Sequence, residues 1–130
     1  MKKITLLLVI IFTFLFSTTS WGDWNYVGES SIGRKYYYDK DRIRKSGKYI
    51  YFWMLIDYIK PSKFGDLSGV SYTELDCSIF RFKRLKLQFY NESMGEGKMT
   101  TDEIPDKEWW YPKPDSYNEY MFNKICEEHQ

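Results

Sequence analysis

Cys77 and Cys126 are the only two cysteines in this chain of 130 residues, and their pairing would constrain the fold more than any other feature. No Cys-x-x-Cys motif is present, and the single histidine, His129, stands almost at the carboxy terminus. A zinc or haem-iron site built from Cys and His ligands is therefore not expected. A disulfide is the favoured use of the pair, and it requires an oxidising compartment.

The amino terminus indicates such a compartment. Lys2 and Lys3 precede an apolar run over 4–16, and small residues follow over 17–20. This pattern is typical of a secretory signal peptide, and a run of about 13 residues is shorter than the ~20 that span a bilayer as a helix. We predict a signal peptide over residues 1–20, with cleavage after Ser20 or as late as Gly22, and no transmembrane span afterwards. An uncleaved anchor is the less favoured alternative.

Export makes a Cys77–Cys126 disulfide the expected state, because an even number of cysteines tends to pair outside the cytoplasm. In the chain-entropy model a bond closing a loop of this length contributes about 4 kcal/mol. Residues 21–130 suit a single domain, small enough to benefit from that link. Without Lys2 and Lys3, 17 of the 19 basic side chains remain against 18 acidic ones. Any attraction for anions must therefore come from a local cluster.

Alternation of side chains predicts strands over 24–27, 34–38, 49–58, 71–90 and 98–101. Tyr49–Tyr58 carries apolar side chains at both parities, which predicts a central strand covered on both faces. Ser71–Tyr90 changes parity partway, so we expect a bulge or a bend within it. Lys60–Gly69 contains Pro and Gly without periodicity, which predicts a loop.

The carboxy-terminal region predicts one helix. Ser116 with Glu119 forms a capping box that opens a helix from Tyr117 to about Glu127. Cys126 would tie this helix to the strand that contains Cys77. The expected fold is therefore α+β, an antiparallel sheet of about five strands with one carboxy-terminal helix held by a disulfide.

The middle of the 71–90 run carries a dense cluster of basic side chains among aromatic ones, namely Arg81, Lys83, Arg84 and Lys86. In a cytoplasmic protein this pattern would suit a nucleic-acid strand. Export argues against nucleic acid and favours polyanions such as heparan sulfate, acidic matrix segments or lipid head groups. The simpler interpretation, which we favour, is a solvated strand face whose charges pair with neighbouring acids.

Aromatic residues make up 20% of the chain and offer a second candidate surface. Tyr49, Tyr51, Trp53, Trp109 and Trp110 could line a groove that stacks on sugars or a flat ligand. Core packing is the alternative, and we favour it for Trp53. For Trp109 and Trp110, which are flanked by a polar loop and prolines, a partly exposed patch and a packed position both remain open.

A catalytic site is not expected. Asp57, Asp76 and Asp102 could act as acid and base only if the fold brought two of them together, and no spacing does so. No histidine is placed to act as a central base, and no nucleophile motif is present. We therefore predict no enzyme activity, no metal site and no cofactor.

A series of short motifs follows along the chain after the predicted signal peptide: Tyr36-Tyr37-Tyr38-Asp39, Arg42-Ile43-Arg44 with Gly47, Trp53, Asp57-Tyr58, Asp76-Cys77, Met94-Gly95-x-Gly97, Trp110, Pro114-x-Ser116 and Cys126. Their succession resembles that of the bacterial surface-adhesin protein E family over essentially the whole mature chain. Lys40, where a proline is common, and the Trp109-Trp110 pair are departures.

The resemblance implies a disulfide-stapled sheet-plus-helix domain without enzymatic activity, in a family named for adhesion to host extracellular matrix. We expect an exported binding protein, in the periplasm or on the outer cell surface, that contacts matrix proteins or polyanions. The alternative is a periplasmic structural or assembly partner that associates through exposed aromatics or a sheet edge, and a small-ligand carrier ranks third. A homodimer stays open.

Overall fold

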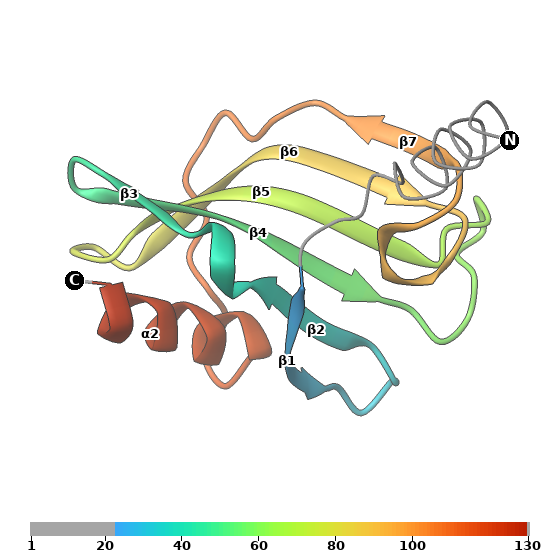
Figure 1. The fold of residues 1–130 in the computed structure, drawn as a ribbon, viewed down its shortest axis with the longest axis horizontal. Coiled ribbons are helices and arrows are strands. Elements are labelled where there is room, and N and C mark those ends of the chain that lie inside the picture. Colours follow the sequence, from blue (N-terminus) through green and yellow to red (C-terminus); the bar gives the residue numbers. More distant parts are fainter. Residues whose placement is uncertain (1–22, 130) are drawn as a thin grey trace, which may run out of the picture.

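The computed structural model describes residues 23–129 (Figure 1). The predicted signal peptide lies outside the described residues. Seven strands form within them: β1 (Trp24–Glu29), β2 (Lys35–Asp39), β3 (Arg44–Ser46), β4 (Tyr49–Asp57), β5 (Ser68–Asp76), β6 (Arg81–Tyr90) and β7 (Met99–Glu103). The helical elements are two single 3₁₀ turns, η1 (Lys40–Arg42) and η2 (Ser93–Gly95), and the helix α2 (Tyr117–His129).

All strands belong to one antiparallel sheet in the order β1-β2-β4-β5-β6-β7, with β3 pairing on β4. The fold class and the central position of β4 are confirmed. The expected count of five strands was wrong. One reason is β3, which is only three residues long, exposed and polar, so it carries no alternation for sequence reasoning to detect.

The other reason is the Ser71–Tyr90 run, which forms two strands rather than one. After β5 the chain turns over 77–80 and returns as β6, with Phe80 at φ 58°. A carboxylate oxygen of Asp76 accepts hydrogen bonds from the amides of Ser78 at 3.1 Å and Ile79 at 3.4 Å, so this side chain organises the turn. The parity change in the sequence therefore marks a hairpin, and β5 already begins at Ser68, inside the expected Lys60–Gly69 loop.

A bulge also occurs in this hairpin, as the change of parity had suggested. Tyr72 faces Lys86, but the next residue, Thr73, faces Arg84, so Leu85 is the extra residue of β6. The bulge determines which β6 side chains point to each side of the sheet.

The helix α2 packs against one face of the sheet, which we call the inner face. The Phe122 ring lies between two strand residues, with ring centroids 5.7 Å from Phe52 and 5.0 Å from Phe82. Buried apolar side chains from the strands and from α2 complete this core, namely Tyr38, Ile50, Met54, Leu75, Met121 and Ile125.

The predicted disulfide is confirmed, with 5.8 Å between the Cα atoms of Cys77 and Cys126. Cys77 lies in the β5–β6 turn rather than within a strand, so the bond joins α2 to the tip of that hairpin. Burial of Cys126 places the link at the edge of the core.

The start of α2 follows the capping prediction in part. The Ser116 hydroxyl accepts the Glu119 amide at 3.1 Å, as expected, but the Glu119 carboxylate accepts the amide of Asp115 rather than that of Ser116. Tyr117 then stacks on Tyr36 with ring centroids 5.2 Å apart. These contacts hold the first turn of α2 against the β1–β2 hairpin.

Candidate functional site

The sheet face opposite α2 carries most of the predicted site residues. Side chains on facing positions of antiparallel strands lie on the same side, so the register of β3, β4, β5 and β6 assigns them. We call this the outer face. Its aromatic members are Tyr49, Tyr51, Trp53, Tyr72 and Trp109, and its cations are Arg44, Lys48, Arg81, Lys83 and Lys86.

The aromatic side chains form two groups of touching rings on the outer face. In the first, Tyr72 lies 4.9 Å from Trp53 and 6.1 Å from Tyr51, measured between ring centroids. In the second, Tyr49 lies 5.4 Å from Trp109. All five rings are partly exposed. The prediction that β4 is covered on both faces therefore holds only in part. On this face Leu55 is fully buried, whereas Tyr49, Tyr51 and Trp53 stay partly exposed.

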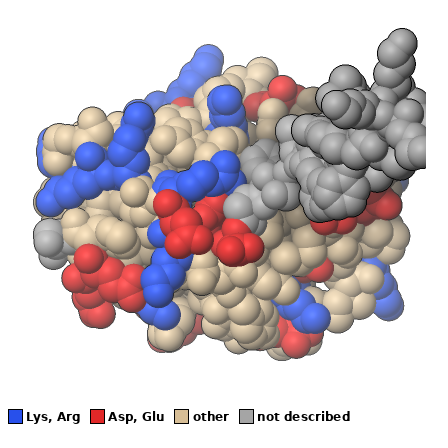
Figure 2. Space-filling model, viewed as in Figure 1, with Lys and Arg blue, Asp and Glu red and all other residues tan. Residues whose placement is uncertain are grey.

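Cations lie on these rings. The Arg81 guanidinium is 4.3 Å and the Lys83 ammonium 4.7 Å from the centroid of Trp109. Arg44 lies over Tyr51 and Lys48 over Tyr49. Contact with a ring holds each long side chain in place while its charge remains near solvent. Figure 2 shows Lys and Arg side chains gathered at the end of the sheet where β3 lies.

Only one of the outer-face cations forms an ion pair with a carboxylate among residues 23–129. The Arg81 Nε atom donates to the buried carboxylate of Asp76 at 3.1 Å, and the Tyr51 hydroxyl donates to Glu74 at 2.8 Å. That hydrogen bond raises the pKa of Tyr51, so its hydroxyl stays protonated. Within residues 23–129, no carboxylate lies within ion-pair distance of the three lysines or of Arg44. These four cations remain available to an anionic ligand.

Arg84 does not join the other three members of the predicted basic cluster. It faces Thr73 across the bulge and forms a paired contact with Asp106, at 2.9 Å and 3.2 Å. Burial alone would raise the pKa of Asp106, but the hydrogen bonds from Arg84 outweigh it and the pKa lies below its ordinary value. Arg84 therefore anchors the segment that follows β7.

The two neighbouring tryptophans also lie on different surfaces. Trp109 belongs to the outer face, whereas Trp110 forms a backbone bridge with Phe82 and is 53% exposed. The Arg84 guanidinium lies 6.0 Å from the Trp110 ring, which completes a small surface apart from the outer face.

Sequence reasoning missed Arg44, Lys48 and Tyr72 as members of the outer face. Tyr72 and Glu74 are two positions apart, so the alternation of the strand could have placed Tyr72 and Glu74 on the same face. No local pattern places Arg44 over Tyr51 or brings Trp109 to Tyr49, because these contacts require the β3–β4 register and the path of the chain after β7.

The described residues hold no group of three or more His, Cys, Asp or Glu side chains arranged to bind a metal ion. Between residues 23 and 129 no helix has the length and apolar character needed to cross a membrane.

Comparison with known proteins gives a family and a fold. The family model described as Surface-adhesin protein E matches residues 24–127. Crystal form II of Haemophilus influenzae protein E is 19% identical with a TM-score of 0.65, covering 86% of this chain and 93% of that chain. The structure of protein E from non-typeable Haemophilus influenzae is 18% identical with a TM-score of 0.61, covering 85% and 79%. A search of curated proteins found no match.

Proposed function

This chain belongs to the surface-adhesin protein E family, and we propose that it is an exported, non-enzymatic binding protein whose outer face contacts extracellular proteins or polyanions. The observation that carries the proposal is Trp109, which lies beneath both Arg81 and Lys83 on a sheet face that α2 leaves open. The family description supports attachment as the function, and the geometry supports this surface as the place.

Polyanionic glycans fit the chemistry of the outer face. Their sulfate or carboxylate groups would pair with cations that have no acidic partner within residues 23–129, and their sugar rings would stack on partly exposed aromatic side chains. Lys48 and Lys83 flank the pair formed by Tyr49 and Trp109, so both interactions are offered within one patch. Acidic segments of matrix proteins would use the same cations.

Binding of the mature protein to immobilised heparin and to matrix glycoproteins tests this proposal. The informative variant is Lys48→Gln, Lys83→Gln and Lys86→Gln, because Arg81 and Arg84 hold buried or half-buried carboxylates and are better left intact. We expect wild-type binding to weaken steeply as salt rises and the triple variant to lose at least about tenfold in affinity at low salt.

The matched control removes the same charge elsewhere, with Lys40→Gln, Lys98→Gln and Lys124→Gln. These exposed side chains lie on η1, before β7 and on α2. Equal losses in the two triple variants would show that net charge alone matters, and no loss in the first would remove the outer face from the proposal.

A second candidate, a periplasmic assembly partner, is favoured by one observation. β7 is an edge strand, paired on one side with β6, and most of its residues are exposed. Such an edge can accept a strand from another chain. Protease treatment of intact cells distinguishes the two candidates, because a surface adhesin is degraded and a periplasmic protein is protected behind the outer membrane.

A further inference from the structure

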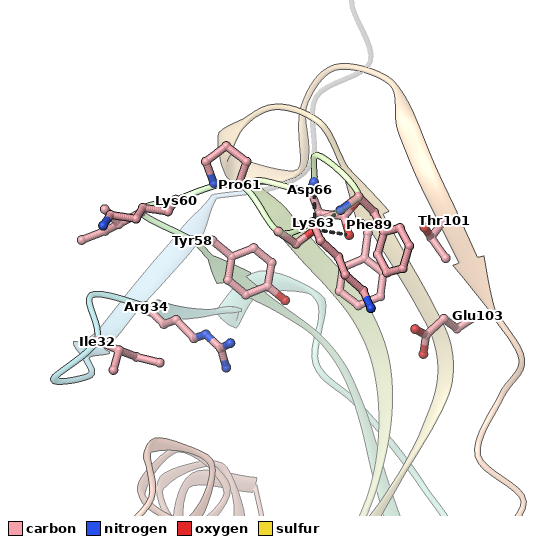
Figure 3. Close-up of a pocket in the computed structure, with 13 residues that line it drawn as sticks. Ile32, Arg34, Tyr58, Lys60, Pro61, Lys63, Asp66, Phe89, Thr101 and Glu103 are labelled. Carbon is pink, nitrogen blue, oxygen red and sulfur yellow. Dashed lines mark hydrogen bonds between the residues drawn. The ribbon is translucent and has the colours of Figure 1, made fainter.

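A pocket of about 880 Å³ lies apart from the outer face (Figure 3). No residue of α2 lines this pocket. The β1–β2 turn, the chain between β4 and β5, and strands β6 and β7 surround it. It occupies a part of the inner face that α2 does not cover. Pockets of this size accommodate small molecules or a few residues of a peptide.

Two aromatic side chains form its apolar wall. Phe89 and Tyr58 meet above Gly69, where an added Cβ would come within 3.0 Å of the Phe89 ring and 3.4 Å of the Tyr58 hydroxyl. Glycine at this position therefore allows both rings to lie close to the sheet. Burial raises the pKa of Tyr58, so its side chain remains neutral. Ile32 and Phe64 stand exposed at the rim, at 69% and 70%.

Three cations line the pocket. Figure 3 shows the Arg34 guanidinium and the Lys63 ammonium directed into the hollow, whereas Lys60 lies at the rim. Arg34 is 5.3 Å from the centroid of Tyr58, so its charge stands beside the apolar wall. In the described part of the chain no carboxylate lies within ion-pair distance of any of these three side chains.

The acids of the pocket do not neutralise these cations. Asp66 is buried and accepts hydrogen bonds from the hydroxyls of Ser62, at 3.0 Å, and Thr100, so it serves the loop structure. Glu103 reaches in from β7, across the hollow from Arg34 (Figure 3). Glu103, across the hollow from Arg34, can accept a hydrogen bond from an N–H group of a ligand whose anionic group contacts Arg34 (Figure 3).

We propose that this pocket binds a carboxylate carried on an aromatic or branched apolar group, with the carboxylate on Arg34 and Lys63 and the apolar group against Tyr58 and Phe89. Guanidinium and carboxylate groups pair through two parallel hydrogen bonds, which gives such a site its direction. Two sources carry this chemistry, the carboxy-terminal residue of a peptide and a free aromatic acid.

Calorimetric titration of the mature protein distinguishes these sources. The probes are Gly-Gly-Phe with a free carboxylate, the same peptide with an amidated terminus, and 3-phenylpropanoate. We expect the free-acid peptide to bind at least tenfold more tightly than the amide. Tighter binding of the peptide than of phenylpropanoate identifies a peptide terminus as the source, and equal binding identifies a free acid.

The variant Arg34→Gln with Lys63→Gln should bind the acid and the amide equally weakly. Both side chains are exposed, so folding is expected to survive, and the thermal midpoint checks this. Lys40→Gln with Lys124→Gln removes the same charge away from the pocket and should bind like wild type. Equal binding of acid and amide by wild type, or no saturable binding of any probe at millimolar concentration, would overturn the proposal. Heparin binding should be unchanged in the pocket variant, which separates this site from the outer face.

Discussion

Asp76 holds both the β5–β6 turn and a cation of the outer face. One of its oxygens accepts from the amide and hydroxyl of Ser78, and the other accepts from Arg81. Burial alone would raise the pKa of Asp76, but these hydrogen bonds outweigh it and its pKa lies below its ordinary value. Asp76 therefore has a structural role in the turn that contains Cys77, and this role does not depend on a ligand.

Because the folded state lowers this pKa, the ionised carboxylate stabilises the protein above the ordinary pKa of about 3.9, and that contribution is lost as pH falls through the lower folded value. Asp76→Asn should therefore cost about 1–3 kcal/mol at pH 7 and much less near pH 2. Urea unfolding at the two pH values measures the difference. A cost that is the same at both would show that the charge of Asp76 contributes nothing.

Trp109 and Trp110 allow a matched comparison at the residue scale. Trp109→Leu removes the ring beneath Arg81 and Lys83, and since a cation–π contact contributes about 0.5–2 kcal/mol, heparin affinity should fall roughly twofold to thirtyfold. Trp110→Leu should leave the affinity unchanged, because that ring lies outside the outer face. Surface plasmon resonance on the two variants decides, and a larger loss for Trp110→Leu would contradict the assignment.

At the scale of elements, α2 is held at two places. Its first turn is fixed by Tyr117, which stacks on Tyr36 and donates a hydrogen bond to the Glu29 carbonyl. Its last turns are fixed by the Cys126 disulfide and by burial of Ile125. The two halves of the helix therefore depend on different parts of the sheet.

Replacing both cysteines by serine should lower the free energy of unfolding by about 4 kcal/mol, because the loop between Cys77 and Cys126 spans 49 positions. Amide hydrogen exchange should accelerate more in the last turns of α2 than in its first turn, which Tyr117 still holds. Urea unfolding and exchange mass spectrometry measure these effects. An unchanged unfolding midpoint would show that packing alone fixes α2.

The elements that could be predicted are those with a local signal. The apolar run of β4 and the capping residues of α2 are each recognisable within a few positions, and the cysteine pair is recognisable because the chain has only two cysteines. The β5–β6 turn could not be predicted, because Phe80 adopts a positive φ where glycine or asparagine is usual. Its conformation depends on Asp76, Arg81 and the disulfide, which are contacts made only after folding.

For the whole molecule, the sheet separates two surfaces of different chemistry. The outer face presents aromatic rings and cations, which we propose contact an extended polyanion, and the open pocket beside Tyr58 is the site proposed for one acidic group. Composition predicted basic and aromatic contact surfaces but could not place them. Arg84 alternates with Lys83 and so points to the other side, and the bulge at Leu85 brings Lys86 back to the side of Lys83. Register, rather than residue type, decides membership of the outer face.

Chemical-shift mapping of the isotope-labelled mature protein with a short heparin oligosaccharide tests the outer face most directly. We predict saturable shifts in the amides of Tyr72, Lys83 and Lys86 and in the Trp109 indole, all on the outer face. The amides of α2, which packs against the inner face, should stay unchanged. Saturable shifts confined to α2 or to the pocket, with the outer face unchanged, would contradict the account.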